Sequence, residues 1–165
     1  MNIFLIGFMG TGKTTVGKKL AKRLNYEFVD LDHEIVASEG REIPEIFAQE
    51  GESYFRDVET KITKKIAYRD NQVVATGGGV VTREENVKCL KENGTVVLLT
   101  AKPEEILKRT SGDDYRPLLE VEDPLAKIKG LLEERKEVYD CTSHQIDTTN
   151  LSVLEVVEKI EEEII

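Results

Sequence analysis

The first fourteen residues restrict the possible folds of this chain more than any other segment. Residues 2–6 read Asn-Ile-Phe-Leu-Ile, and residues 7–14 read Gly-Phe-Met-Gly-Thr-Gly-Lys-Thr. The second segment fits the pattern G-x-x-x-x-G-K-[ST], and residues 13–24 carry apolar side chains at helical spacing. A strand, a glycine-rich loop and a helix in this order predict a loop that binds the phosphates of a nucleoside triphosphate.

The residue types in this loop suit an anion that carries a metal ion. Glycines at positions 7, 10 and 12 let successive N–H groups point toward a phosphate, and the helix that follows adds partial positive charge. A lysine can reach the β- and γ-phosphates, and a threonine hydroxyl can bind Mg²⁺. Glycine-rich turns also occur without a ligand, but that alternative explains neither of these side chains. The expected nucleotide contacts are Gly10, Thr11, Gly12, Lys13, Thr14 and Thr15.

Predicted strands and helices alternate along the rest of the chain. Further strands are expected at 27–30, 73–75, 95–100 and 145–147. Helices are expected at about 33–38, 44–49, 52–68, 84–92, 103–109, 124–139 and 153–164. This alternation predicts a parallel sheet with helices on both faces, in which the very apolar run 95–100 is a central strand. Ligands of such sheets bind at the carboxyl ends of the strands.

Length and charge limit the possible classes of function. A chain of 165 residues predicts a single domain, 1–165. The net charge of −9 argues against a surface for nucleic acid or anionic membrane. No apolar run approaches the length of a membrane span, and the first strand begins at residue 2, so we expect no signal peptide and a cytoplasmic protein. Cys89 and Cys141 lie too far apart in sequence to suggest a zinc site or a disulfide framework.

Two carboxylates lie at the end of the predicted strand 27–30, in the sequence Asp30-Leu-Asp32. One of them can reach Mg²⁺ through water, while the other accepts a hydrogen bond from a second substrate. The alternative is that an aspartate here caps the following helix. A helix cap readily explains one of the two aspartates, but it explains both less readily.

Two arginines lie on predicted helices in positions that suggest an anionic partner. Arg56 is three residues from Glu59 on one helix face, where an ordinary surface ion pair is the alternative. Arg135 interrupts the apolar stripe of its helix. A buried arginine needs an anion beside it, unless the side chain extends along the surface to reach water.

Two further arginines, Arg109 and Arg116, bracket a polar stretch that contains Ser, Gly and two Asp. A loop flanked by arginines suits a lid that closes over phosphates and brings positive charge to the transferred group. An ordinary solvated loop is the alternative.

Taken in order, these motifs resemble the shikimate kinases. The matching segments cover nearly the whole chain: 7–15, 28–32, 47–59, 76–79 (Thr-Gly-Gly-Gly), 109–119 and 135–139. The resemblance implies a three-layer α/β P-loop fold of the nucleoside monophosphate kinase type. Its parallel sheet has five strands in the order 2-3-1-4-5, with helices on both faces and a mobile lid. It also implies transfer of the γ-phosphate of ATP to the 3-hydroxyl of shikimate, with Mg²⁺, in aromatic amino-acid (chorismate) biosynthesis.

The resemblance assigns roles by position. The shikimate-binding residues would be Asp32, Arg56, Gly78, Gly79 and Arg135, with Glu59 orienting Arg56. Thr14 would bind Mg²⁺ directly and Asp30 through water, while Arg109 would lie beside the adenine. Lys13, Asp32 and Arg116 would be the catalytic residues. The lid would span about 110–119, and the acceptor-binding helical segment about 31–60.

One segment departs from the family pattern. The family often has a basic residue beside the adenine after the last strand, whereas residues 148–152 read Thr-Thr-Asn-Leu-Ser, so backbone groups or Asn150 would contact the base. Without the resemblance, the residues predict a kinase for a small, anionic, hydroxylated acceptor. A gluconate-type or nucleotide kinase, or a non-catalytic ATP-binding switch, are the alternatives. We expect a monomer whose partners are ATP and shikimate, with no nucleic acid and no membrane.

Overall fold

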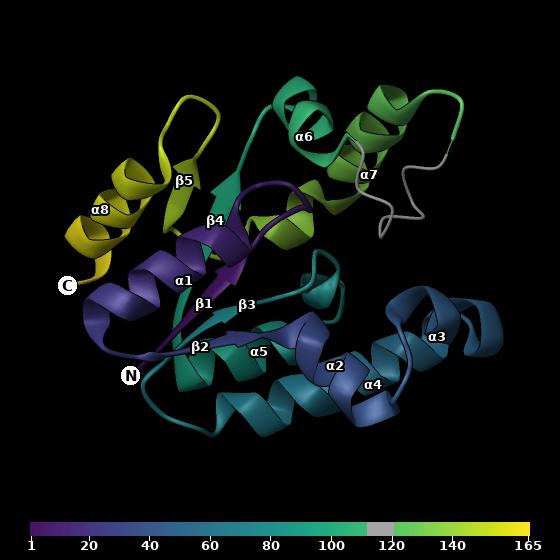
Figure 1. The fold of residues 1–165 in the computed structure, drawn as a ribbon, viewed down its shortest axis with the longest axis horizontal. Coiled ribbons are helices and arrows are strands. Elements are labelled where there is room, and N and C mark those ends of the chain that lie inside the picture. The colour runs from purple at the N-terminus through teal and green to yellow at the C-terminus, as the bar shows by residue number, and fades with distance from the viewer. Residues whose placement is uncertain (112–120) are drawn as a thin grey trace.

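The computed structural model of the chain describes residues 1–111 and 121–165. Within these residues a parallel sheet forms the centre of the molecule, with the strand order β2-β3-β1-β4-β5 (Figure 1). Its strands are β1 (Asn2–Ile6), β2 (Glu27–Asp30), β3 (Gln72–Ala75), β4 (Gly94–Thr100) and β5 (Gln145–Asp147). The order 2-3-1-4-5 is therefore confirmed. Because every pairing is parallel, the carboxyl ends of the strands meet at one edge of the sheet.

Helices cover both faces of the sheet, as predicted. Helices α1 (Lys13–Leu24) and α8 (Val153–Ile164) contribute apolar side chains to the core on one face. The core on the other face is built by α4 (Glu52–Ala67), α5 (Glu84–Asn93), α6 (Pro103–Thr110) and α7 (Pro124–Tyr139). The result is a three-layer arrangement with two separate apolar cores (Figure 1).

Successive residues of β1 face opposite cores, because side chains alternate along a strand. Ile3 and Leu5 pack with α1 and α8, whereas Phe4 and Ile6 pack on the other face, and all four side chains are fully buried. The run 95–100 was expected to be central. Its strand, β4, is internal, but the middle position belongs to β1, at which the strand order reverses direction.

Short helices lie beyond the carboxyl ends of β2 and β3. They are α2 (Leu31–Glu39), α3 (Ile43–Glu50) and the 3₁₀ helix η1 (Val80–Thr82), which follows the triple glycine. Helix α2 begins two residues before the predicted start because Asp30 caps it directly at the end of β2. In Figure 1, α2 and α3 lie in the lower part of the view, on the side of β2, and α6 and α7 lie in the upper part.

No helix in the described ranges is long and apolar enough to span a membrane.

Candidate active site

The phosphate-binding loop connects β1 to α1 at the carboxyl edge of the sheet. Gly7 has a φ of +143°, and a Cβ there would collide with the carbonyl oxygen of Leu99, so no other residue fits without a shift of the backbone. Helix α1 begins at Lys13 and receives no side-chain cap within the described part of the chain. Its first N–H groups therefore stay available for an anion.

Lys13 folds back over this loop. The residue is 9% exposed, and its Nζ donates to the carbonyl oxygens of Gly7 at 2.6 Å and Phe8 at 2.9 Å. The Thr11 hydroxyl, which is also buried, donates to the Phe8 carbonyl at 2.8 Å. The lysine ammonium thus lies at the centre of the loop, and a bound phosphate would compete with these carbonyls for it.

Thr14 and Asp30 face each other across the start of α1 and the end of β2. The Thr14 hydroxyl lies 3.4 Å from Oδ2 of Asp30, while Oδ1 of Asp30 accepts from the backbone N–H groups of Asp32 and His33. The helix cap considered as an alternative is therefore real for Asp30, yet its second oxygen stays directed at Thr14. Thr15 is exposed in the first turn of α1.

These two oxygen groups suit Mg²⁺. The described residues include no cluster of three or more His, Cys, Asp or Glu that would hold a metal ion alone. Mg²⁺ commonly takes only one or two protein oxygens and completes its octahedron with substrate phosphates and water. A hydroxyl and a carboxylate beside the phosphate-binding loop fit that pattern.

The glycines after β3 mark the point where the residues expected to bind the acceptor meet. A Cβ on Gly79 would collide with the guanidinium of Arg56. A Cβ on Gly77 would lie 2.9 Å from Oε2 of Glu59 and 3.2 Å from Oδ1 of Asp32. These side chains come from α2 and α4, so the triple glycine lets two helices bring charged groups against the backbone of a third segment.

Arg135 reaches the same turn from α7. Its Nη1 would lie 3.5 Å from a Cβ on Gly78, and its guanidinium carbon lies 5.8 Å from the centroid of the Phe8 ring. With 9% of the residue exposed, Arg135 does not extend along the surface, and that alternative is wrong. Tyr139, one helical turn further on, donates its hydroxyl hydrogen to the Gly78 carbonyl. The sequence pattern gave Tyr139 no role.

Glu59 is the buried centre of this charged group. It is 1% exposed, and its Oε1 accepts from Nη1 of Arg56 at 2.8 Å, so the pair is no ordinary surface ion pair. Oε2 has no hydrogen-bond partner among the described residues. Burial raises the pKa of the Glu59 carboxyl, and the positive charge of Arg56 opposes this increase. Asp32 raises the same pKa further and Arg135 lowers it, which shows that the four groups share one electrostatic environment.

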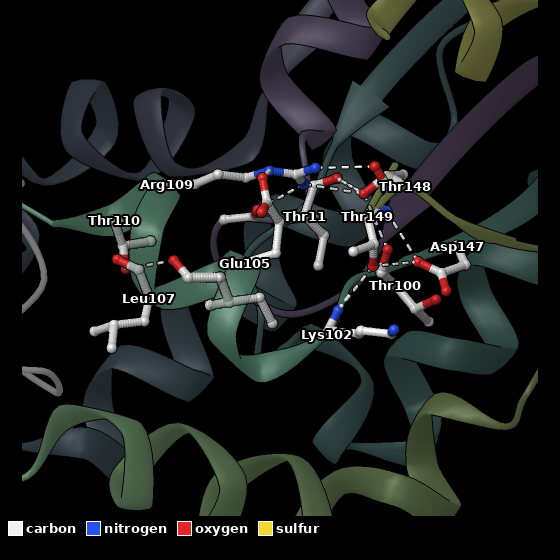
Figure 2. A network of polar contacts seen from close by, with 12 residues as sticks. Thr11, Thr100, Lys102, Glu105, Leu107, Arg109, Thr110, Asp147, Thr148 and Thr149 are labelled. Carbon is white, nitrogen blue, oxygen red and sulfur yellow. Dashed lines mark hydrogen bonds and ion pairs between the residues drawn. The ribbon is translucent and has the colours of Figure 1, made fainter. Parts of the chain in front are cut away.

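On the nucleotide side, Arg109 of α6 lies between the phosphate-binding loop and the segment after β5 (Figure 2). Its Nη1 donates to the Gly10 carbonyl at 3.2 Å and to the Thr148 hydroxyl at 3.0 Å, and its Nη2 donates to the Thr148 carbonyl at 2.9 Å. Its Nε contacts Glu105 one turn earlier at 3.1 Å. Arg109 therefore joins the phosphate-binding loop to the segment after β5, and its place beside the adenine stays a prediction.

The segment after β5 is held by its own threonines. Thr148 is buried, and Thr149 donates both its N–H and its hydroxyl hydrogen to Oδ1 of Asp147. These two bonds lower the pKa of the Asp147 carboxyl. Asn150 is exposed. Sequence reasoning named Asn150 here and missed Thr148, although a threonine directly after a parallel strand lies at the edge where ligands bind.

Two predicted features lie outside the described residues. Arg116 is one of them, and the other is most of the lid at about 110–119, of which Thr110 and Ser111 are described. The acceptor-binding segment 31–60 corresponds to α2, α3 and the first half of α4.

Comparison with known proteins identifies the family. A family model described as shikimate kinase matches residues 9–165. The shikimate kinase of Pelotomaculum thermopropionicum is 48% identical over 159 residues, which are 96% of this chain and 92% of that protein. The shikimate kinase of Thermodesulfovibrio yellowstonii is 50% identical with the same coverage. The chain belongs to the shikimate kinase family.

Solved structures of this family share the fold. Shikimate kinase from Acinetobacter baumannii in complex with shikimate superposes with a TM-score of 0.94 at 43% identity, covering 98% of this chain and 91% of that chain. The shikimate kinase of Aquifex aeolicus has a TM-score of 0.83 at 36% identity, with 99% and 95% coverage. The resemblance to shikimate kinases and the P-loop kinase fold predicted from the sequence are both confirmed.

Proposed function

We propose that this chain transfers the γ-phosphate of ATP to the 3-hydroxyl of shikimate, giving shikimate 3-phosphate and ADP in aromatic amino-acid biosynthesis. One observation carries the proposal: Arg56 and Arg135, from separate helices, meet at the triple glycine beside the phosphate-binding loop. Membership of the shikimate kinase family supports it, as does the similar protein solved in complex with shikimate.

The acceptor side suits a small hydroxylated carboxylate. Each guanidinium offers paired N–H donors in a planar fork that matches a carboxylate. The Asp32 carboxylate can accept from hydroxyl groups, and the backbone N–H groups of Gly78 and Gly79 add donors. A Cβ on Gly78 would lie 3.6 Å from both the Gly7 carbonyl oxygen and the Met9 nitrogen, so an acceptor here would adjoin the phosphates.

The nucleotide side suits a triphosphate with Mg²⁺. The N–H groups of the loop and the Lys13 ammonium would hold the phosphate oxygens, and Thr14, supported by Asp30, would hold the metal. When bound, Mg²⁺ neutralises charge on the phosphates. Phosphoryl transfer needs mainly positioning and charge stabilisation, so Asp32 would act by holding the acceptor hydroxyl in line. Arg116 as a lid residue, a monomeric state and a cytoplasmic location stay predictions from the sequence.

A coupled assay of ADP release tests this function. Shikimate, gluconate and nucleoside monophosphates are offered separately with ATP and Mg²⁺, and only shikimate should support turnover. Turnover with gluconate or a nucleotide instead, or ATP binding without any acceptor-dependent release, would favour the alternatives named above and overturn the proposal.

A variant of Arg135 sharpens the assay. Arg135→Lys keeps the charge and loses the fork, so KM for shikimate should rise roughly 10- to 150-fold, the loss expected for one charged hydrogen bond. KM for ATP should stay within about twofold. Arg23→Lys is the matched control, since Arg23 near the end of α1 pairs with Glu161 of α8 at 2.7 Å, and its contacts among the described residues do not include the proposed site.

A further inference from the structure

The segment after β5 contains a buried hydroxyl that joins three parts of the nucleotide side. Thr148 is 3% exposed. Its Oγ1 lies 3.0 Å from Nη1 of Arg109, 3.0 Å from the Thr11 carbonyl oxygen and 3.0 Å from the Thr100 carbonyl oxygen (Figure 2). These groups belong to α6, the phosphate-binding loop and the end of β4, and Thr148 and Thr11 are 137 residues apart in sequence.

The hydrogen bonds of Thr148 leave Arg109 little freedom. A hydroxyl has one hydrogen to donate and two lone pairs with which to accept. The Thr148 hydroxyl accepts from Nη1 of Arg109 and shares its own hydrogen between the two carbonyls, while the Thr148 carbonyl accepts from Nη2 of Arg109 at 2.9 Å. Thr148 thus accepts hydrogen bonds from both terminal nitrogens of the Arg109 guanidinium, which fixes the plane of that group.

The same contacts orient the phosphate-binding loop. The Thr11 carbonyl is directed at Thr148, and the Gly10 carbonyl is directed at Arg109. In a trans peptide the N–H points opposite to the C=O, so the N–H groups of Thr11 and Gly12 point away from Arg109 and Thr148. Inward N–H groups are what a phosphate-binding loop requires.

We propose that Thr148 is a positioning residue for the nucleotide. Its hydroxyl holds the base-side arginine and the phosphate-binding loop in one arrangement, so that the base and phosphate subsites are formed together before ATP arrives. The inference rests on the proposed function in that the nucleotide is taken to be ATP. Preorganisation of this kind raises affinity by reducing the loss of freedom on binding.

Variants at 148 and 149 test the proposal. Thr148→Val keeps the shape and removes the hydroxyl, and Thr148→Ala leaves room for water if the valine variant does not fold. Thr148→Ser keeps the hydroxyl. Thr149→Val is the matched control, because the Thr149 hydroxyl contacts Asp147 and the backbone N–H of Lys102 but not the loop.

Calorimetry measures the binding of ATP and of inorganic tripolyphosphate, which lacks the base, and kinetics measures both KM values. We expect Thr148→Val or Thr148→Ala to weaken both ligands, ATP by about tenfold or more. Thr148→Ser and Thr149→Val should stay within about threefold of wild type. KM for shikimate should be unchanged in all variants, which a general loss of structure would not allow.

Two outcomes would overturn the proposal. A loss confined to ATP would show that Thr148 does not act on the loop. Equal effects at 148 and 149, visible in melting temperature but not in ATP affinity, would leave Thr148 with a purely structural role. Because ATP binding is measured without an acceptor, these outcomes are separate from a failure of shikimate-dependent turnover, which would contradict the proposed function instead.

Discussion

Gly79 shows how closely the acceptor side is packed at the level of single residues. Any Cβ at this position would collide with the Arg56 guanidinium, so an alanine must displace that group. We expect Gly79→Ala to raise KM for shikimate about tenfold or more, as for loss of one charged hydrogen bond, with KM for ATP changed less than twofold. Steady-state kinetics checks this. Gly130→Ala is the control, since nothing lies within 4 Å of a Cβ there, and equal KM values for shikimate in both variants would contradict the prediction.

Glu59 should make stability depend on pH. Burial raises its pKa above the ordinary value of 4.5, so the folded state holds the proton more tightly than the unfolded chain does. The stabilisation of the protonated form is complete below about pH 4.5 and is lost as pH rises through the folded-state pKa. Relative to Glu59→Gln, the wild-type free energy of unfolding should therefore fall as pH increases from 4 to 8, as measured by urea unfolding.

Asp147 provides a control of opposite sign. Its pKa is lowered by the hydroxyl and the N–H of Thr149, so its contribution is present above the ordinary value of 3.8 and is lost on acidification. The wild type should therefore gain stability relative to Asp147→Asn as pH rises. The same sign of pH dependence for both pairs would refute the electrostatic account of Glu59.

At the level of elements, the junction of β2 and α2 combines two tasks in Asp30. Asp30→Ala removes the cap of α2 and should cost about 1 kcal/mol of stability. Asp30→Asn keeps an oxygen for the cap and should cost less, since asparagine is an equally good cap. Both should raise the Mg²⁺ concentration needed for half-maximal activity, because the charge beside Thr14 is lost. Unfolding curves and Mg²⁺ titrations of kcat measure the two effects.

A variant of Ser152 is a control for the loss of a helix cap without any change beside Thr14. Ser152 caps α8 in a capping box with Glu155, and its side chain accepts from the Glu155 backbone N–H. Ser152→Ala should lower stability by about 1 kcal/mol and leave the Mg²⁺ titration unchanged. If it shifted that titration as much as Asp30→Asn, the metal role of Asp30 would lose its support.

Elements with a strong local signal were predictable from the sequence. The strands and helices follow apolar periodicity, and the glycines, Pro103 and Pro124 mark loops and helix starts, so observed boundaries lie within a few residues of those expected. The start of α2 was misplaced because a carboxylate that caps a helix looks the same in sequence as one that faces a metal. The apolar run of β4 correctly indicated a buried strand with a neighbour on each side, but hydrophobicity does not show which strand takes the middle position of the sheet.

The proposed site could be predicted only where its residues form motifs. Lys13 and Thr14 follow from a local sequence pattern. Arg56 and Arg135 stand out because of their neighbours on the helix, a glutamate three residues from Arg56 and an apolar stripe around Arg135. Tyr139 and Thr148 carry no such signal, because their importance depends on partners 61 and 137 residues away. Contacts of that range are set by the order of strands in the sheet, which no short stretch of sequence encodes.

At the scale of the whole molecule, ligands should stabilise the fold, because the site takes residues from elements along most of the chain. An unreactive ATP analogue with Mg²⁺ at 100 times its Kd should add about 2.7 kcal/mol. For a chain of this size that corresponds to a rise in Tm of roughly 5–10 °C. Thermal unfolding with analogue, shikimate, both or neither measures it. Gluconate is the negative control, and an absence of any shift with shikimate would contradict the acceptor site.

The edge of the parallel sheet opposite the proposed site is available for attaching a dye or a linker. All proposed substrate contacts lie at the carboxyl ends of the strands, so the turns that enter the strands face the other way. Asp70, in the turn before β3, has a side chain that is 85% exposed, and the terminal amino group of Met1 lies 3.9 Å from it. The two native cysteines are less accessible to a thiol reagent than an exposed cysteine at position 70 would be, since Cys89 is buried and Cys141 is partly buried. A dye or a linker to a solid support, joined at Asp70→Cys or at the amino terminus, would therefore leave both substrates open access from solution.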